Sequence, residues 1–265
     1  VGSEMCIRDR DYLIKVKGYS FLEAVETIIG HTAIQAPVYE KPQLKEENKP
    51  LLLPEKCASN RVITEYLFGR GIDFEIINYC ISNDLIFESL PYHNVVFVGY
   101  DEKKEAKYAA YRSTNKRRIM GDCSGSKKDY SFRLGKENLE EVHLFECAID
   151  LLSYATLAKL NGQDWKEMSF VSLSGVYSPA KKIEDSKVPI ALEKYLGSNP
   201  SVRKIRIHFD NDIAGRKAAQ TLKIILPDKY EIVDEPPKAG KDFNDFLCMQ
   251  MGIYNKKTHE RNEER

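Results

Sequence analysis

The sequence predicts an α/β protein, in which a parallel sheet flanked by helices is preceded by a smaller α+β module. The first observation is that short apolar runs alternate with helical patterns throughout residues 139–253, as is typical of a parallel sheet covered by helices. The second is that residues 57–138 show two helical patterns followed by short strand patterns, which indicates an α+β module. The third is that 42% hydrophobic residues, with 15 Tyr and 11 Phe, are enough to build a core.

The expected elements follow from these patterns. In the α+β module, helices are predicted near 60–68 and 73–82, and strands at 94–100, 107–113 and 130–134. In the second half, strands at 142–146, 168–175, 203–209 and 230–235 alternate with helices at 148–160, 187–196, 214–225 and 242–251.

The segments at the ends carry weaker patterns. Residues 1–10 follow no hydrophobic period and look like a translated sequencing adapter, so we expect them to be non-native; the alternative is a frayed genuine terminus. Residues 11–35 contain two short helical patterns that cannot fold alone. Residues 36–56, with four prolines and eight charges, are predicted to be a linker, and residues 254–265 form a charged tail.

Composition excludes several classes of protein. No apolar stretch reaches the roughly 18 to 20 residues of a membrane span, and the start lacks the apolar run of a secretion signal. We therefore expect a cytoplasmic protein without a membrane partner. The six cysteines are scattered with no C-x-x-C pair, so we expect reduced thiols and no zinc in this chain.

The charges are balanced overall but unevenly distributed. The chain has 40 basic and 40 acidic residues, and this balance excludes a globally basic nucleic-acid binder. Residues 101–136, however, hold 11 basic and 5 acidic residues. We call this segment the basic island.

Acidic residues follow or flank three of the predicted strands. Glu146 closes the first strand, Asp210 and Asp212 follow the third, and Asp242 and Asp245 stand at the start of the last helix. Ligands of open parallel sheets bind beyond the carboxyl ends of the strands. Acids in these positions are therefore candidates for a functional site.

The D-x-D pair has the chemistry of a divalent cation site. In extended chain, Asp210 and Asp212 lie on one side, about 6 to 7 Å apart along the backbone. Mg²⁺ prefers one or two carboxylates with waters and phosphates, and needs neither Cys nor His. The sequence therefore predicts Mg²⁺, with Mn²⁺ as the alternative ion. The simpler interpretation is that these aspartates cap the helix beginning near Ile213.

The other acids also have a simpler interpretation. Asp150 lies four residues after Glu146, in the first turn of a predicted helix, where an acid interacts favourably with the helix dipole. Asp242 and Asp245 surround a helix start, where capping accounts for both.

Taken together, the motifs resemble a known family. FE-x-AID-x-LS from residue 145, S-x-SG from 172, HFDNDIAG from 208 and KD-x-ND-x-L from 241 occur in this order. This series resembles the Toprim domain of topoisomerases and bacterial primases, and most closely the primase-like Toprim proteins of plasmids and integrative elements.

The resemblance extends upstream of residue 139. YLFGRGID (66–73), YHNVVFVGYDE (92–102), RSTN (112–115) and GSKKDYSFRL (125–134) look like the uncharacterised, primase-core-like domain that precedes Toprim in those proteins. Residues 11–35 look like the end of a primase zinc-binding domain without its metal-ligating part. The resemblance therefore implies a longer protein whose zinc finger lies upstream.

The resemblance also implies roles for the acids. Glu146 matches the general acid or base of the family, and Asp210 and Asp212 match its Mg²⁺ ligands. Asp242 and Asp245 resemble a later acidic motif, but their D-x-x-D spacing departs from that of replicative primases, and Asp150 is a further candidate ligand. The roles of these three acids therefore stay open.

Basic residues supply candidate contacts to nucleic acid. Those of the basic island, near Tyr108 and Tyr111, suit phosphate contact and base stacking on single strands: Arg112, Lys116, Arg117, Arg118, Lys127 and Lys128. The alternative is a solvated hairpin. Lys241 and Arg216 are candidates for binding nucleotide phosphates.

The function expected from this combination is Mg²⁺-dependent nucleotidyl transfer on single-stranded DNA, from nucleoside triphosphates, in replication or transfer of a mobile genetic element. A helicase or relaxase of the element is the expected protein partner. Two alternatives stay open, because one metal site serves several reactions. They are a Toprim nuclease and a non-catalytic DNA-binding accessory module.

Overall fold

The computed structural model describes residues 49–253 apart from 116, 176, 178 and 181, and before residue 49 only 12–14, 16, 17, 19 and 27. The expectations for residues 1–10 and 254–265, and nearly all of those for 11–48, lie outside the described residues. From residue 49 onward the described chain forms one compact unit. Within the described residues, no helix has the length and apolar character needed to span a bilayer.

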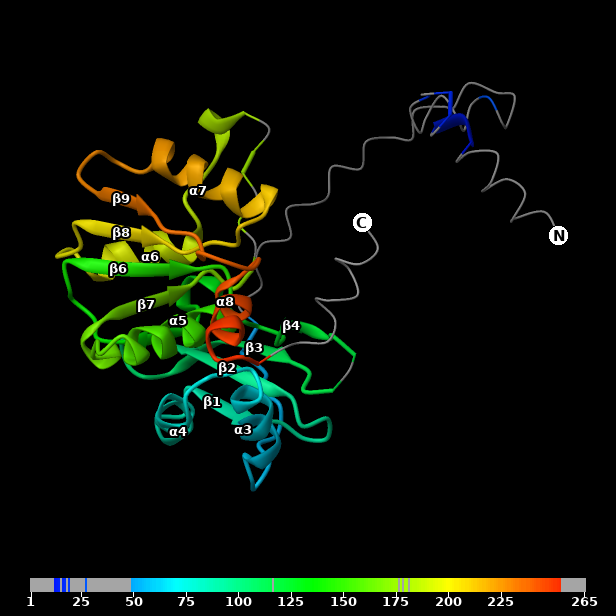
Figure 1. Cartoon of the computed structure of the whole chain (residues 1–265), viewed down its shortest axis with the longest axis vertical. Coiled ribbons are helices and arrows are strands. Elements are labelled where there is room, and N and C mark those ends of the chain that lie inside the picture. Colours follow the sequence, from blue (N-terminus) through cyan, green and yellow to red (C-terminus); the bar gives the residue numbers. More distant parts are fainter. Residues whose placement is uncertain are drawn as a thin grey trace. The chain divides into compact units, whose positions relative to one another are not determined.

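A five-stranded sheet organises the second half of the chain (Figure 1). Its order is β5-β7-β6-β8-β9, in which β6 (Glu141–Phe145), β7 (Ser169–Ser172), β8 (Lys204–Ile207) and β9 (Glu231–Asp234) are parallel. The edge strand β5 (Arg133–Gly135) pairs antiparallel with β7. The predicted parallel sheet is therefore confirmed.

Helices cover both faces of this sheet. Alternate residues of β6 point to opposite faces. Val142 and Leu144 pack into a cluster with α6 (Ile190–Ser198) and α7 (Ile213–Ile225). Phe145 packs instead with α5 (Ala148–Leu160) and α8 (Phe243–Gln250). The loops of this half contain two short 3-10 turns, η2 (Trp165–Glu167) and η3 (Ile183–Asp185).

The first half of the described chain is the predicted α+β module. Helices α3 (Arg61–Phe68) and α4 (Phe74–Ser82) precede an antiparallel sheet in the order β1-β2-β3-β4. Its strands are β1 (Ile86–Glu88), β2 (Val95–Tyr100), β3 (Ala106–Arg112) and β4 (Met120–Asp122). Strands β2 and β3 match the predicted ones, whereas β1 and β4, of three residues each, are not predicted by the sequence pattern.

One predicted strand has an unexpected partner. The run at 130–134 is expected in the α+β module, but the strand that forms there, β5, pairs with β7 of the parallel sheet. Residues 128–130 form the 3-10 turn η1 (Lys128–Tyr130) instead. A short apolar run identifies a strand but not its partner, and β5 finds an unpaired edge on β7.

The two sheets share one hydrophobic core. Ile63 of α3 and Ile76 of α4 belong to the same buried cluster as Phe145, Ile149 of α5 and Leu247 of α8. Their side chains are at most 2% exposed. This shared cluster holds the α+β module against the parallel sheet. It therefore fixes the position of one sheet relative to the other.

The chain that leads from the antiparallel sheet to β5 of the parallel sheet passes very close to the backbone of β2. At Gly99 of β2, an added Cβ would lie 1.7 Å from the carbonyl oxygen of Tyr130. The segment that follows η1 therefore crosses β2 at a position where only glycine fits.

We expect Gly99→Ala to lower the free energy of unfolding by about 1–3 kcal/mol or more, because the backbone around Tyr130 must shift. Gly197→Ala in α6 is the matched control, since its Cβ would meet no atom within 4 Å. It should be neutral or stabilising by up to about 1 kcal/mol. Urea denaturation of both variants measures the difference. An equal decrease in stability in the two variants would contradict the proposed close approach.

Candidate functional site

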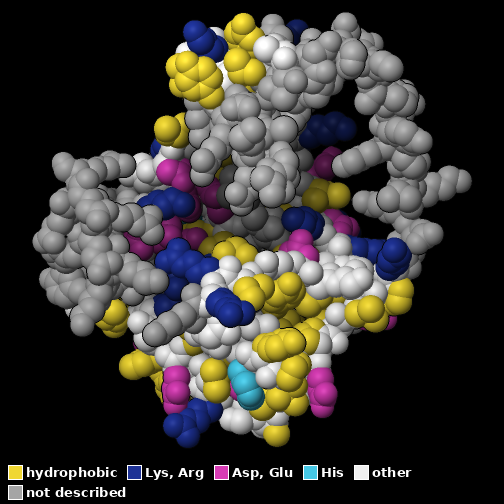
Figure 2. Space-filling view, turned by 90° about the vertical axis from the view of Figure 1, so that its right-hand side faces the viewer, with side chains coloured by type: hydrophobic (Ala, Val, Ile, Leu, Met, Phe, Trp, Pro, Cys, Tyr) yellow, Lys and Arg dark blue, Asp and Glu magenta, His cyan; other side chains and the backbone are white. Residues whose placement is uncertain are grey.

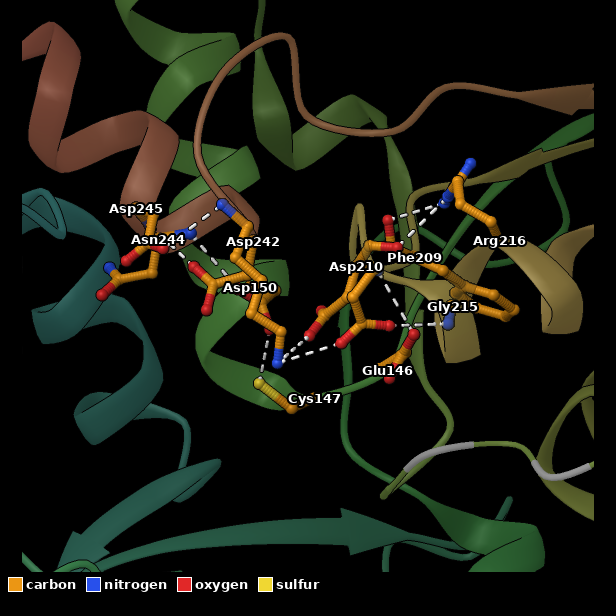
Figure 3. Close-up of polar contacts among 12 residues, drawn as sticks. Glu146, Cys147, Asp150, Phe209, Asp210, Gly215, Arg216, Asp242, Asn244 and Asp245 are labelled. Atoms are coloured by element: carbon orange, nitrogen blue, oxygen red, sulfur yellow. Dashed lines mark hydrogen bonds and ion pairs between the residues drawn. The ribbon is translucent and has the colours of Figure 1, made fainter. Parts of the chain in front are cut away.

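Two acids from neighbouring strands meet at the carboxyl edge of the parallel sheet (Figure 3). Glu146 directly follows β6, and Asp210 lies three residues after the end of β8, its parallel neighbour. The backbone N–H of Asp210 donates to Glu146 Oε1 at 3.2 Å. Glu146 is only 5% exposed. The fold thus brings together two residues that are 64 positions apart in sequence.

Asp212 joins this pair while it also caps a helix. Its Oδ1 accepts a hydrogen bond of 2.9 Å from the N–H of Gly215, in the first turn of α7. Its Oδ2 lies 3.2 Å from Lys241 Nζ, which is also 3.2 Å from Asp210 Oδ2. Capping therefore accounts for one oxygen of Asp212, and the other faces the ammonium group of Lys241 that also contacts Asp210.

Gly215 allows α7 to start close to the two acids. A Cβ at this position would lie 2.2 Å from the carbonyl oxygen of Asp210 and 2.9 Å from Glu146 Oε1. Since one of these contacts is with backbone, a larger residue would displace the chain at Asp210. The absence of a side chain at Gly215 is therefore a requirement of the site.

The remaining predicted acids form a second group at the start of α8 (Figure 3). Asp242 caps α8 by accepting a 2.7 Å bond from the N–H of Asp245. The buried Asp150 accepts hydrogen bonds from Cys147 Sγ at 2.8 Å and from the N–H of Asn244 at 3.2 Å. The capping interpretation thus holds for Asp242, and Asp150 ties α5 to α8.

Burial and mutual repulsion control the protonation of these acids. Burial, with the charges of Asp210 and Asp212, raises the pKa of Glu146 to about 7. Burial also raises the pKa of Asp210, although Lys241 opposes the shift. Hydrogen bonds, led by the one from the N–H of Gly215, lower the pKa of Asp212.

Burial and nearby charges also shift the pKa values of Asp150 and Lys241. Burial, and then the charge of Asp242, raise the pKa of Asp150 to about 7. Partial burial of Lys241 would lower its pKa, but its hydrogen bonds to Asp210 and Asp212 outweigh this and raise it. Lys241 therefore stays charged and offsets part of the negative charge of the D-x-D pair.

The donor set fits a hard divalent cation. Asp210 Oδ2 and Asp212 Oδ2 both face the ammonium group of Lys241, and Mg²⁺ takes carboxylate oxygens of this kind. Lys241 can withdraw, because 57% of its side chain is exposed. In the described chain, however, no three of these carboxylates bring ligand atoms within 4.8 Å of one another. Their metal-binding role stays a prediction.

A cleft of about 280 Å³ lies beside the acids, between β3, β4, the first turn of α5 and the loop after β7. Arg112 and Lys128 from the basic island line it, together with Tyr108 and Tyr111. Cys147, the neighbour of Glu146, lines its other wall. The cleft therefore extends from the basic island to the residue next to Glu146, although none of the three acids lines it.

The other predicted basic residues have varied surroundings. Arg117, Arg118 and Lys127 are exposed, whereas Lys116 lies outside the described residues. Lys128 forms an ion pair of 3.1 Å with Asp122. Figure 2 shows Lys and Arg side chains beside Asp and Glu side chains in the middle of the face that it presents. Their contact with nucleic acid stays a prediction.

Arg216 has a structural role that the sequence did not indicate. Its guanidinium donates to the carbonyl oxygen of Phe209 at 2.8 Å and to Asp234 Oδ1 at 2.7 Å. It therefore links the chain after β8 to the end of β9. Binding of nucleotide phosphates by Arg216 stays a prediction, and it would compete with these contacts.

Comparison with protein families agrees with this geometry. Residues 143–247 match the family described as Toprim-like, and residues 65–138 match the family described as protein of unknown function DUF3991. The chain therefore contains a Toprim-like domain that follows a DUF3991 domain. The predicted resemblance to a Toprim protein is confirmed.

Solved structures to which the chain is similar include primases. The primase fragment of the bacteriophage T7 primase-helicase protein is 18% identical, covers 70% of this chain and 69% of its own, and has a TM-score of 0.47. The E. coli primase catalytic core is 12% identical, with coverages of 77% and 72% and a TM-score of 0.46. The Aquifex aeolicus primase is 15% identical, with coverages of 92% and 67% and a TM-score of 0.44. No curated protein matches the chain.

The raised pKa of Glu146 makes stability depend on pH. Between about 4.5 and about 7 the folded protein binds more protons at Glu146 than the unfolded chain does, so this residue lowers the free energy of unfolding as pH rises. At pH 8, Glu146→Gln should therefore be more stable than the parent by about 1–2 kcal/mol, after allowance for solvent screening. The gain should disappear near pH 4.5.

Urea denaturation at the two pH values measures this effect. Glu140→Gln is the matched control, because Glu140 is exposed on the same segment and should show no such gain. An equal gain for both variants at pH 8 would mean that the effect comes from net charge and not from the acid pair.

Proposed function

We propose that the protein is a primase-like enzyme that transfers nucleotides in a Mg²⁺-dependent reaction on single-stranded DNA, in the replication or transfer of a mobile genetic element. The observation that carries this proposal is the pairing of a buried Glu146 with Asp210, beside a cleft lined by Arg112 and Lys128. When a hydroxyl attacks a phosphate, a carboxylate is needed to accept the proton of the hydroxyl, and positive charge is needed to neutralise the phosphate oxygens.

Glu146 is suited to proton transfer at neutral pH. A general base works best when its pKa lies near the working pH, and the pKa of Glu146 is raised to about 7. Its Oε1 is held by the N–H of Asp210, which fixes the carboxyl group relative to the D-x-D pair. In this proposal Glu146 removes the proton from the attacking 3′ hydroxyl, whose oxygen bonds to the α-phosphorus of the nucleoside triphosphate while the α–β bridging bond breaks and pyrophosphate leaves.

Asp210 and Asp212 would hold the divalent cation through their Oδ2 atoms. When bound, the ion would neutralise charge on the phosphate oxygens of the nucleotide. Lys241, which faces both oxygens, can move outward to a phosphate when the ion enters. The lysine thus offsets part of the negative charge of the D-x-D pair before the substrates arrive.

The cleft would guide the template and nucleotide. Arg112 and Lys128 offer positive charge, while Tyr111, which also lines the cleft, offers an aromatic face for a base. Arg117 and Arg118 extend the positive surface beyond it. Because stacking and phosphate contacts read no base edges, this surface would accept many template sequences.

Primer synthesis on single-stranded DNA with labelled nucleoside triphosphates tests the function. We expect Mg²⁺-dependent labelled oligonucleotides from the parent protein and none from Asp210→Asn with Asp212→Asn. Glu146→Gln should lower kcat by about 10²-fold or more, as for removal of a general base. The parent rate should rise with pH as Glu146 loses its proton, with a midpoint at or below about 7, because a cation bound by Asp210 and Asp212 would reduce the repulsion that raises the pKa of Glu146.

Glu140→Gln serves as the control and should keep the parent rate. A Mg²⁺-dependent shortening of the template, without labelled products, would replace synthesis with nuclease activity. DNA binding with neither product would indicate an accessory module. Either result would contradict nucleotidyl transfer.

A second experiment tests the predicted nucleic-acid contacts Arg117 and Arg118, which lie at one end of β3 within the basic island. Arg117→Ala with Arg118→Ala should weaken binding to single-stranded DNA and reduce the salt dependence of log K by roughly 0.7 for each phosphate that is no longer neutralised. Lys103→Ala with Lys104→Ala is the matched control, because this exposed pair lies in the turn at the opposite end of β3. A slope that is unchanged, or changed equally by both pairs, would indicate a merely solvated hairpin. Fluorescence anisotropy between about 50 and 200 mM salt measures the slope.

A further inference from the structure

A second group of ligand-type side chains lies in the α+β module, on other elements than the acids. Cys57 Sγ, a carboxylate oxygen of Glu88 and a ring nitrogen of His93 all lie within 4.8 Å of one another. In the described part of the chain, no other trio of Cys, His, Asp or Glu meets this condition. A thiol, an imidazole and a carboxylate are together the donors that Zn²⁺ takes in proteins.

Glu88 is a buried carboxylate with both oxygens directed to specific places. Its side chain is 2% exposed. One oxygen, Oε2, accepts from the N–H groups of Val62 at 2.9 Å and Ile63 at 3.3 Å, in the first turn of α3. The other, Oε1, lies 2.6 Å from His93 Nδ1. Burial of a carboxylate is costly unless it is paired or coordinates a metal.

Backbone contacts hold the two other side chains against Glu88. The N–H of Cys57 donates to the carbonyl oxygen of Glu88 at 2.7 Å. His93 has a φ of 52°, in the left-handed region that non-glycine residues seldom occupy. This turn is secured by bonds from the N–H of His93 to Ser89 and from Thr114 Oγ1 to the carbonyl oxygen of His93. The trio is therefore positioned by the fold and not by chance side-chain contact.

We propose that Cys57, Glu88 and His93 bind one Zn²⁺ ion, with water at a fourth position. Tetrahedral zinc with ordinary bond lengths separates its ligand atoms by about 3.4 to 3.6 Å. The present separations, from 2.6 Å to at most 4.8 Å, bracket this value, so shifts of about 1 Å suffice. The side chain of His93 is 45% exposed and can make most of this adjustment.

The ion would cross-link three segments of the α+β module. Cys57 precedes α3, Glu88 ends β1, and His93 precedes β2. Glu88 already holds the start of α3 through Oε2, so zinc on Oε1 would connect that helix, the hairpin and the incoming chain. The site is independent of the proposed nucleotidyl transfer, because it shares no residue with Glu146, Asp210 or Asp212.

The simpler interpretation is that Glu88 caps α3 and accepts a hydrogen bond from His93, with Cys57 as a neighbour. That arrangement satisfies Glu88 without a metal. It makes no use of the thiol, however, and it predicts no binding of zinc by this group. A metal titration therefore separates the two interpretations.

The test is titration of the full-length reduced, metal-free protein with Co²⁺, and then displacement by Zn²⁺. We expect one Co²⁺ to bind with thiolate-to-metal charge-transfer absorption in the near ultraviolet, which carboxylates alone cannot give. Zn²⁺ should abolish this absorption and raise the Tm in proportion to the logarithm of its free concentration. Cys57→Ser should remove the absorption, and His93→Gln should weaken zinc binding by roughly tenfold or more.

Cys123→Ser is the matched control, since Cys123 is as half-buried as Cys57 and lies outside the trio. It should bind as the parent does. Asp210→Asn with Asp212→Asn should also keep the absorption, which separates this site from the D-x-D pair. The proposal is overturned if the parent gives no thiolate absorption, or if Cys57→Ser retains it. If Cys57→Ser fails to fold by circular dichroism, unchanged zinc affinity in His93→Gln overturns it.

Discussion

The constraint on which the Toprim-like half depends is the repulsion between carboxylates at one sheet edge. Parallel pairing of β6 with β8 places Glu146 against Asp210, and Asp212 follows on the same side. Two carboxylates about 4 Å apart repel by roughly 4 kcal/mol at an effective dielectric of about 20. A fold that keeps them together must supply compensating groups.

The compensation comes from three different sources. Lys241 contributes a positive charge between Asp210 and Asp212, from a loop that follows β9. Backbone N–H groups contribute hydrogen bonds, to Glu146 from Asp210 and to Asp212 from Gly215. Because its pKa is raised to about 7, Glu146 is largely protonated below neutral pH, and this removes one negative charge from the group. The ammonium group of Lys241 and the proton of Glu146 can be withdrawn or replaced, whereas the backbone donors are fixed by the fold; the proposed exchange of cations and protons needs this combination.

The sequence predicted a strand correctly where the residues of that strand alone form a recognisable apolar pattern. The parallel strands were predictable because their apolar runs are bounded by helices of ordinary length, and β2 and β3 because each is six or seven residues long. Strands β1 and β4 have three residues each, too few to show an alternation, and they form only because β2 and β3 offer them edges. The partner of β5 was missed for the same reason, since pairing is decided by tertiary structure.

The site shows the same division between local and distant information. The D-x-D spacing and the glutamate after a strand are local, so Glu146, Asp210 and Asp212 could be singled out. The ion pairs of Lys241 bridge up to 31 positions, and the bond between Asp150 and Asn244 spans 94. Such contacts follow from the order of the strands in the sheet, which no spacing in the sequence reveals. The trio in the α+β module was missed because its members, at 57, 88 and 93, follow no metal-binding spacing.

The shared core determines how the acids and the basic island can work together. Side chains from α3 and α4 are buried in the same cluster as Phe145 and Ile149, which directly flank the segment carrying Glu146. A hinge between the two halves would have to separate this cluster and expose its apolar surface to water, at about 25 cal/mol for each Å². Small side-chain movements, such as withdrawal of Lys241, cost far less because that side chain is already 57% exposed. In the proposed function, entry of substrate into the cleft would therefore depend on side chains at its rim, while the shared core keeps Arg112 at a fixed position relative to the segment that carries Glu146.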